Sequence, residues 1–583
     1  AVYAALAQYE QALTYYQRSL KLHEELGNRM MTAYSLNGAG NVRYKQGNYR
    51  EAATLSARAA DLARESNSRE TLWQALTSQG RAERALNQHE QARRSFSEAI
   101  EVIEKLRSQA AGNEQDRQLF FENKTAPYLA MVELSLAQGD KAGAFVYSER
   151  AKGRMLLDVL RNGRADINKA LTPEEREQEK SLNASIIALN SQLRRESLER
   201  QPDQRRVDEL EARLQKARLE YDAYQTRIYA SHPTLKVQRG DADPLSTDEA
   251  IALLPDTKTV LLEYVVTAEK TYLFVLSRKG KANEEPSGAV EVKVYEIAVN
   301  AQDLAARIVD FRRRLAQNSL DFKETAGRLY DLLLRPAQKE LEGKATVCII
   351  PSGQLWELPF QALLSQPDRY FLKDHALFYA PSLSVLREMH KKQSADHRAA
   401  IVDAARPADV LMKASLAQSS ATPSLLALGN PALSANLISR SKSTKRDLSL
   451  GALPEAEREV KALGEIYGTH NSRILIGGAA QEETVKAEAG KYPILHFATH
   501  ATLDNDDPLY SHLLLASSSE QEDGFLEARG IMKLDLHAEM VVLSACQTAR
   551  GRVSSGEGLV GMSWALFIAG TSTTVASQWE VDS

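Results

Sequence analysis

Apolar and polar positions in the first third of the chain follow a helical pattern that repeats at a fixed interval. The segments YEQA at 9–12, YREA at 49–52 and HEQA at 89–92 are spaced by 40 residues, and Gly40 and Gly80 keep the same period. Self-similarity at a period of this length is typical of stacked helical pairs, each of which completes its core against its neighbours. The pattern therefore predicts an all-α superhelix at the start of the chain.

The repeated unit resembles the tetratricopeptide helix–turn–helix. The resemblance is carried by GNVRYKQGNYREA at 40–52, whose small residues lie where two helices must approach closely, although Arg43 stands where an aromatic residue is usual. A more degenerate unit at 139–160 extends the array, so we expect tetratricopeptide repeats over residues 1–165. Such arrays bind other protein segments on their concave face.

A different helical period follows the repeats. Leu182, Ile186, Leu189 and Leu193 step by four, three and four, and a similar spacing resumes over residues 207–228 after a turn at 201–203. Apolar seams of this spacing are typical of coiled coils. We therefore expect an antiparallel helical hairpin within residues 166–240.

From about residue 245, short apolar strands alternate with helices. The expected strands are 260–266, 272–277, 290–297 and 346–351, with an amphipathic helix near 301–341, and then 425–429, 473–476, 494–499, 512–516, 540–545 and 573–579. This alternation predicts two α/β units with mostly parallel sheets. We place them at 245–390 and 424–583, joined by a loose Ala- and Ser-rich connection at 391–423. Because an apolar strand ends directly before Ser583, we expect the second unit to be truncated at its C-terminus.

Composition narrows the classes of function. The net charge of −4 argues against direct nucleic-acid binding, and no apolar run approaches the ~20 residues of a membrane-spanning helix. Two cysteines leave no thiols for a disulfide framework or a structural zinc site, and they fit a reduced, cytoplasmic setting. Cys348 lies inside an apolar strand and is interpreted as an inert core thiol. We expect no metal and no cofactor.

The candidate chemistry lies where two apolar strands end. His500 closes one strand and Cys546 closes another 46 positions later. Parallel strands side by side would bring both residues to the same carboxyl edge, where open α/β sheets hold their active sites. An imidazole beside a thiol produces the thiolate that cysteine catalysis requires. His496 lies mid-strand and is interpreted as a buried histidine bonded to a neighbour, which leaves His500 as the candidate base.

The sequence around both residues resembles the CHAT family of caspase-like proteases, relatives of separase. The segments that carry the resemblance are HFATH at 496–500, LSACQT at 543–548, GEGL at 556–559, AG at 569–570, WEVD at 579–582, IPSGQL at 350–355 and LPF at 358–360. The resemblance spans about residues 245–583. It implies an amino-terminal pseudo-protease half followed by a catalytic half, and a tetratricopeptide array in front is a common arrangement.

The resemblance implies a cysteine endopeptidase that cleaves a protein substrate. His500 is then expected to take the Cys546 proton and later to give it to the leaving amine. Backbone N–H groups of Cys546 and Ala501 are expected to stabilise the oxyanion. Ala501 departs from the glycine that relatives often have at this position.

In the separase-like branch, acidic residues near the strand after the catalytic cysteine recognise a basic side chain before the cut. Glu580 and Asp582 lie in the corresponding part of this chain, and Trp579 is expected to line an adjacent pocket. Asp504 and Asp507, which follow His500, are further substrate-binding candidates. We expect a protein substrate or a regulatory protein on the concave face of the repeats, and a protease held inactive until that partner binds. The alternative is a non-catalytic scaffold, in which the repeats bind partners and the protease-like region is silent.

Overall fold

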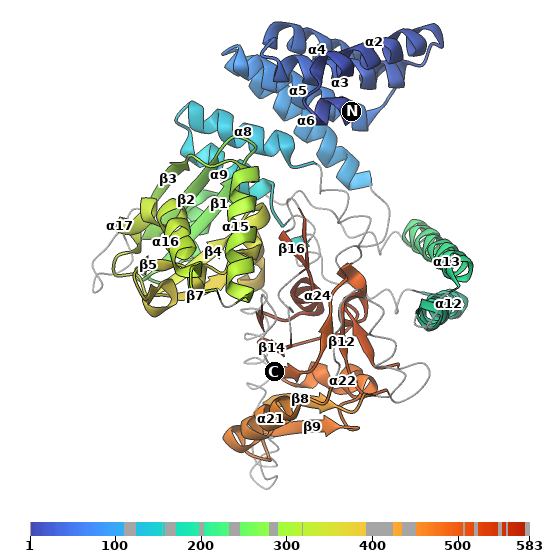
Figure 1. Ribbon diagram of the computed structural model, residues 1–583, viewed down its shortest axis with the longest axis vertical. Helices are drawn as coiled ribbons and strands as arrows, with labels where there is room; N and C mark the ends of the chain where they lie inside the picture. Colours follow the sequence, from blue (N-terminus) through green and yellow to red (C-terminus); the bar gives the residue numbers. More distant parts are fainter. Residues whose placement is uncertain are drawn as a thin grey trace, which may run out of the picture.

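Among the residues that the structure describes, those up to 231 contain helices and no strand, and strands alternate with helices after them (Figure 1), which confirms the predicted order of an all-α part before an α/β part. The computed structural model describes residues 2–109, 124–153, 156–157, 171–197, 203–231, 245–278, 290–317, 319–391, 424–433, 451–504, 508–517, 523–545, 551–554 and 558–577. The expected connection at 391–423 lies almost wholly outside these ranges. Among the helices described, none combines the length and apolar character that crossing a bilayer requires.

The repeats form a stack of antiparallel helices. They are α1 (Val2–Ala5), α2 (Tyr9–Glu25), α3 (Arg29–Lys45), α4 (Tyr49–Glu65), α5 (Arg69–Ala85) and α6 (His89–Gln109). The periodic glycines serve the close approach expected of them, because a Cβ on Gly80 would lie 2.5 Å from the ring of Phe96 in the next helix. The core of the stack runs continuously from Leu36 to Met131.

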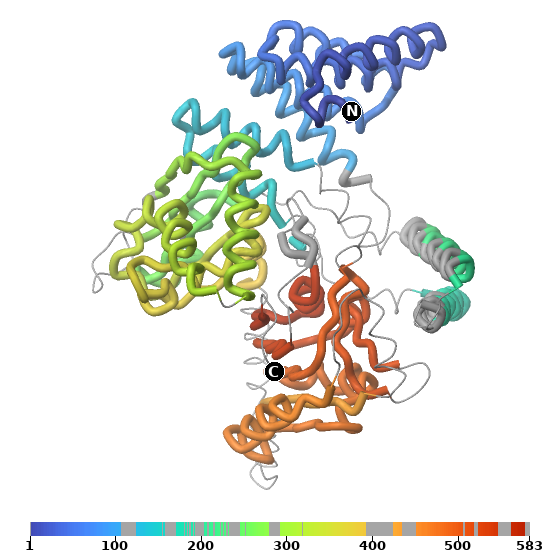
Figure 2. Tube along the Cα trace, viewed as in Figure 1, coloured from blue at the N-terminus to red at the C-terminus, as the bar shows by residue number. Residues whose placement is uncertain are grey.

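Two further helices join the stack to the first sheet. They are α8 (Ala126–Ala137) and α9 (Lys141–Arg150), which lie between the blue array and the green sheet in Figure 2. Helix α8 is mostly apolar, with Glu133 paired to Arg84 of α5, as expected of a helix that is buried on two sides. Tyr128 and Met131 of α8 face the repeat core. Val132 of α8 and Phe145 of α9 pack on the sheet. Leu129 and Tyr147 pack against both clusters, so α8 and α9 join the core of the repeats to the core of the sheet.

The first sheet has the strand order β3-β2-β1-β4-β7. Its strands are β1 (Thr259–Val266), β2 (Thr271–Arg278), β3 (Val290–Ile297), β4 (Thr346–Ile350) and β7 (Ala376–Tyr379). Pairs β1–β4 and β4–β7 are parallel, whereas β1–β2 and β2–β3 are antiparallel, so the prediction of a mostly parallel sheet is wrong here. The four residues between β1 and β2 allow only a hairpin, since a parallel connection needs a long crossover.

One face of this sheet is covered by α15 (Ala301–Ala316) and α16 (Phe322–Leu333), and the other by α8 and α9. The single helix expected near 301–341 is thus interrupted. Polar turn-forming residues around Ser319 and Asp321 end the first helix, and Pro336 starts a 3-10 turn before the short α17 (Gln338–Leu341). Two small strands, β5 (Leu364–Gln366) and β6 (Arg369–Tyr370), lie beyond it.

The second sheet is parallel throughout, as predicted, with the order β17-β14-β10-β8-β9. Its strands are β8 (Leu425–Pro431), β9 (Ser472–Gly477), β10 (Ile494–Ala498), β14 (Met540–Ser544) and β17 (Thr573–Ala576). Helix α21 (Pro454–Tyr467) covers one face. Helices α22 (Glu482–Glu488) and α24 (Met562–Ala569) cover the other.

The expected strand at 512–516 lies outside this sheet. It forms β12 (His512–Leu514) of a small antiparallel sheet with β11 (Ala501–Thr502) and β13 (Phe525–Glu527). A two-stranded sheet joins β15 (Gly551–Ser554) and β16 (Gly558–Gly561). The apolar pattern of 512–516 marked it correctly as a strand, but its short connection to β11 allows only antiparallel pairing.

The region between the repeats and the first sheet contains two long antiparallel helices, α12 (Pro173–Ser197) and α13 (Gln204–Ser231). Tyr221 Oη donates to Glu179 at 3.2 Å, and Tyr224 Oη donates to the carbonyl of Glu175 at 2.7 Å. The partners advance along α13 as they recede along α12, which shows the antiparallel arrangement directly.

Candidate active site

The histidine strand and the cysteine strand lie side by side. Strand β10 pairs in parallel with β14, Ile494 opposite Met540 and Ala498 opposite Ser544. The offset between paired positions is 46, the same as the separation of His500 and Cys546 along the chain. His500 follows the end of β10 by two residues and is half-buried, whereas Cys546 lies outside the described residues, directly after Ala545.

The ring of His500 is held by a backbone carbonyl. Its Nε2 lies 2.9 Å from the carbonyl oxygen of Gly451, in the segment that leads into α21. A carbonyl only accepts hydrogen bonds, so Nε2 carries the proton and Nδ1 carries the lone pair. The main chain is fixed as well, because Leu514 N–H donates to the carbonyl of His500 at 2.9 Å. This arrangement supplies an oriented imidazole whose basic nitrogen is Nδ1.

His496 lies in a different environment, because its side chain is buried beside a carboxylate. Its Nε2 is 3.1 Å from Oε1 of Glu459 on α21. Burial lowers the pKa of His496, and the nearby carboxylate opposes that effect. The other oxygen of Glu459 accepts a hydrogen bond from Ser544 Oγ at 3.0 Å, so the carboxylate bridges β10 and β14 two residues before Cys546.

Helix α21 brings both Gly451 and Glu459 to the site, and neither residue stood out in the sequence. Its apolar stripe of Ala456, Val460, Leu463 and Tyr467 packs on the sheet. The helix lies close, because a Cβ on Gly429 of β8 would be 2.7 Å from the carbonyl oxygen of Ala456. Glu459 lies next to Val460 of this stripe. Its position at the border of an apolar helix face is the sequence feature that could identify it as a residue near the sheet.

The remaining site candidates fall into two groups. Ala501 lies in β11 opposite Leu513, and the backbone N–H of Asp504 donates to Ser511 Oγ at 3.0 Å. The other candidates, Asp507, Trp579, Glu580 and Asp582, lie outside the described residues, as does Cys546. Their described neighbours meet at one edge, since Ser577 Oγ after β17 donates to the carbonyl of Ala545 at 2.5 Å.

Cys348 is the core thiol expected from the sequence. It is fully buried in β4, and burial raises the pKa of its thiol, with the charges of Glu149 and Glu263 acting in the same direction. A thiol in this state is not a nucleophile. Within the described ranges, no group of three or more histidine, cysteine or acidic side chains is arranged to hold a metal ion.

Comparison with known families finds one match near each end of the chain. Residues 323–583 match the CHAT domain, and residues 1–65 and 32–105 match the tetratricopeptide repeat. The chain combines tetratricopeptide repeats with a CHAT domain. The CHAT match begins within α16 and includes His500, Gly451 and Glu459.

Two similar proteins add to this comparison. The tetratricopeptide–CHAT chain is 25% identical over 310 residues to Tetratricopeptide repeat protein 28 of Mus musculus, which covers 46% of this chain and 11% of that protein. The separase–securin complex of Saccharomyces cerevisiae gives a TM-score of 0.34 at 9% identity and covers 95% of this chain and 46% of that chain. The chain therefore spans about a tenth of the length of the curated relative and under half of the solved chain.

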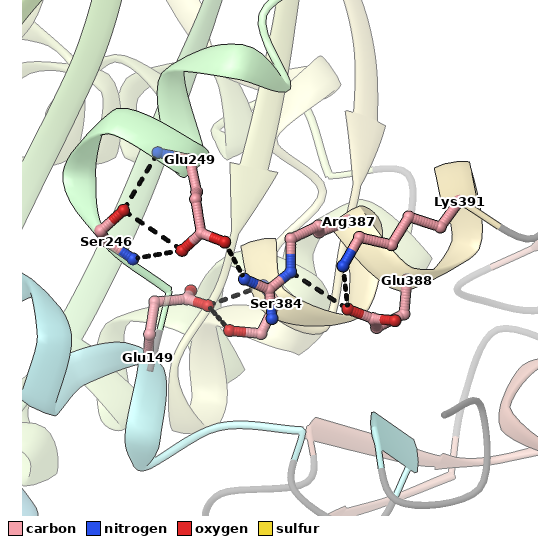
Figure 3. A network of polar contacts seen from close by, with 7 residues as sticks. All are labelled: Glu149, Ser246, Glu249, Ser384, Arg387, Glu388 and Lys391. Atoms are coloured by element: carbon pink, nitrogen blue, oxygen red, sulfur yellow. Dashed lines mark hydrogen bonds and ion pairs between the residues drawn. The ribbon is translucent and has the colours of Figure 1, made fainter. Parts of the chain in front are cut away.

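The last helix of the array inserts polar groups into the neighbouring α/β part. The Glu149 carboxylate of α9 accepts hydrogen bonds from Leu383 N–H at 3.0 Å, Ser384 N–H at 2.7 Å and Ser384 Oγ at 2.7 Å. It thus caps the helix at residues 383–391 from another part of the chain (Figure 3). Farther along that helix, Arg387 pairs with Glu249 of α14 (Thr247–Ala252) at 2.7 Å.

A buried ion pair lies beside this cap. Lys152 Nζ donates to Glu263 Oε1 at 2.7 Å and to the carbonyl of Tyr264 at 2.9 Å, both in β1. Glu263 is fully buried, and Ser148 Oγ also donates to it. Burial, followed by the charge of Glu263, raises the pKa of Glu149 to about 7, while Lys152 and the capping hydrogen bonds act in the opposite direction.

Both helical regions also contact the segment that follows the His500 loop. Leu156 and Leu157, just beyond the array, pack with Val385, Trp564, Ile568 and Leu509. The next residue, Tyr510, packs against the α12–α13 cluster of Leu189, Leu210 and Ala217. Leu509 and Tyr510 belong to the short turn η7 (Pro508–Tyr510). This turn begins six residues before Leu514, whose N–H donates to the carbonyl of His500. The repeats and the hairpin therefore reach the CHAT domain close to the candidate base.

Proposed function

We propose that this chain is a cysteine endopeptidase of the caspase and separase type, with His500 as general base and Cys546 as nucleophile. The observation that supports it most is the register of β10 and β14. Since their offset equals the separation of the two residues, both follow paired positions by the same number of residues. The CHAT match over residues 323–583 points to the same class of protein.

The proposed reaction follows from the protonation state of the ring. Cys546 gives its thiol proton to Nδ1 of His500, and the thiolate attacks the carbonyl carbon of the scissile peptide bond. The imidazolium that forms keeps Nε2–H on the Gly451 carbonyl, where the hydrogen bond becomes charge-assisted. Backbone N–H groups of Ala501 and Cys546 stabilise the oxyanion. His500 then protonates the leaving amine, and water hydrolyses the thioester.

The proposed substrate is a protein with a basic residue before the cut. Trp579, Glu580, Asp582, Asp504 and Asp507 remain the candidates from the sequence. Glu459 joins them, because its side chain is 41% exposed and its carboxylate binds Ser544, two positions before Cys546. A partly exposed carboxylate at this level attracts a lysine or arginine side chain of a bound substrate.

Covalent labelling tests the catalytic assignment. We expect a peptidyl chloromethyl ketone with a basic residue next to the ketone to alkylate Cys546 and leave the buried Cys348 unmodified. His500→Ala should reduce the labelling rate by at least a hundredfold. His537→Ala is the matched control, since His537 is 70% exposed. Undiminished labelling in His500→Ala contradicts the assignment.

We also propose that a protein partner on the concave face of the repeats regulates the site. Support comes from the cluster of Leu156, Leu157 and Leu509, which connects the residues after α9 with the loop after His500. The Glu149 cap in addition fixes α9 to the helix at 383–391. A reducing, cytoplasmic setting keeps the Cys546 thiol available for this chemistry. The alternative of a silent scaffold rests on the same array, and it predicts that Cys546 reacts no faster than an ordinary exposed thiol.

A further inference from the structure

Asn430 has an unusual backbone conformation at the end of β8, the strand beside the histidine strand. Its φ is +46°, in the left-handed region, and the pairing of β8 with β9 shifts register between Gly429 and Pro431. Asparagine tolerates this region better than most residues, but a following proline restricts the backbone further. Conformations of this kind persist only where surrounding contacts hold them, and they concentrate at functional sites.

The side chain of Asn430 holds the start of α21. Its Oδ1 accepts the backbone N–H of Leu453 at 2.7 Å, and its Nδ2 donates to Glu457 Oε2 at 2.9 Å. Leu453 occupies the N-cap position of α21, and its own side chain cannot cap. Asn430 therefore fixes the entry to the helix from a neighbouring strand. Two residues before Leu453 stands Gly451, whose carbonyl binds His500.

We propose that Asn430 is a positioning residue for the candidate base, acting through the Leu453–Gly451 segment to hold the Gly451 carbonyl against Nε2 of His500. This inference rests on the proposed function only for its consequence in catalysis. The structural part stands by itself, because it concerns the ring of His500 and not the reaction of Cys546.

The chemical reason is the directionality of the carbonyl bond. Nε2–H of His500 meets its acceptor at 2.9 Å, close to the ideal length, so a displacement of the segment by less than one ångström weakens the bond. The ring then rotates about its side-chain torsions, and Nδ1 no longer stays directed at one place. Asn430 Oδ1 accepts the N–H of Leu453 at 2.7 Å, and so fixes the end of this segment two residues after Gly451.

Three substitutions separate the backbone of Asn430 from its side chain. Asn430→Gly relieves the left-handed backbone but removes both hydrogen bonds, and Asn430→Ala removes them and keeps the strain. Asn430→Asp keeps an acceptor for Leu453 but replaces the donor to Glu457 by a second carboxylate, so it is made together with Glu457→Gln. The matched control is Asn87→Ala in the repeats, where the asparagine also has a positive φ of +59° but lies far along the chain from the site.

Two readouts on the full-length protein test the proposal. The first is the ring N–H signal of His500 in histidine-labelled protein, assigned by its loss in His500→Gln. We expect exchange with water to broaden this signal in Asn430→Gly and Asn430→Ala, and we expect it to persist in Asn430→Asp and Asn87→Ala. The second is the rate of Cys546 alkylation by a peptidyl chloromethyl ketone, which should fall about tenfold in the Gly and Ala variants, as for one lost hydrogen bond.

The outcomes are distinguishable. A wild-type ring signal in Asn430→Gly overturns the positioning role, whatever the alkylation rate. A ring signal lost in Asn430→Gly together with a wild-type protein whose Cys546 does not react supports the positioning role and contradicts the proposed protease. Equal loss of the ring signal in Asn87→Ala also overturns the inference, because it would show that the signal reports general stability.

Discussion

Substituting Gly429 with alanine should displace α21, the helix that directly follows the Gly451 segment. The added Cβ would lie 2.6 Å from Val460 Cγ2 and 2.7 Å from the carbonyl oxygen of Ala456, both on α21. The first atom is on a side chain, but the second is backbone and moves only with the helix. Restoring an ordinary contact of 3.4 Å requires α21 to move away from β8 by about 0.7 Å.

The size of this movement sets the expected effects. Overpacking of this kind costs about 1–3 kcal/mol of unfolding free energy. If the entry to α21 moves with the helix along the bond direction, the 2.9 Å separation of Gly451 O and His500 Nε2 lengthens to about 3.6 Å, beyond a normal hydrogen bond. We therefore expect Gly429→Ala to unfold at lower denaturant concentration and to slow Cys546 alkylation by about tenfold.

A matched substitution and a partial rescue make the test specific. Gly327→Ala in α16 adds a Cβ that meets no atom within 4 Å, so it should be neutral or slightly stabilising and leave alkylation unchanged. Val460→Ala in the Gly429→Ala background removes the side-chain clash but not the clash with Ala456, and it should restore neither property fully. Wild-type stability and wild-type alkylation in Gly429→Ala would refute the packing argument.

Three further predictions concern the junction and the substrate. The pKa of Glu149 is raised to about 7 in the folded protein from an ordinary 4.5. The folding stability linked to its protonation is therefore present below pH 4.5 and lost as the pH rises through 7. Denaturant titrations should show a loss of roughly 3 kcal/mol in the wild type and a much smaller loss in Glu149→Gln. Leu509→Ala should lower the unfolding free energy by about 2–4 kcal/mol and slow Cys546 alkylation. Leu36→Ala, in the repeat core, should lower the unfolding free energy as much without slowing alkylation. Equal alkylation rates in the two variants would contradict the proposed link between the end of the array and the site. Glu459→Gln should weaken the preference for lysine or arginine before the cut in a peptide library, mainly through KM, and an unchanged preference would remove Glu459 from the candidates.

The spacing of apolar residues along the chain predicted those parts of the fold whose residues contact near neighbours in sequence. The 40-residue period gave the helical stack, because each unit repeats its own apolar spacing and its own small residues at the close contacts. Apolar strands separated by helix-length segments gave the parallel second sheet. The apolar pattern does not predict the antiparallel half of the first sheet, because the direction of pairing between β1 and β2 is set by their four-residue connection.

The sequence also predicts some residues of the site and not others. The register of β10 and β14 agrees with the expected neighbourhood of the histidine and cysteine strands, and His496 lies buried beside Glu459 as expected of a structural histidine. The roles of Gly451 and Asn430 cannot be predicted in this way, because they depend on a hydrogen bond between a loop and a strand residue 23 positions earlier. A backbone carbonyl in particular leaves no trace in residue identity.

The shared core around α8 limits how this protein can be divided or recombined. Val132, Ala144 and Phe145 belong to the helical part by sequence, yet they complete the apolar face formed by Leu261 and Phe274. A fragment that begins after α9 would expose that face and uncap the helix at 383–391, and it is expected to aggregate. An exchange of repeat arrays between proteins of this design is therefore expected to succeed only at a junction before α8, with α8 and α9 travelling with the sheet.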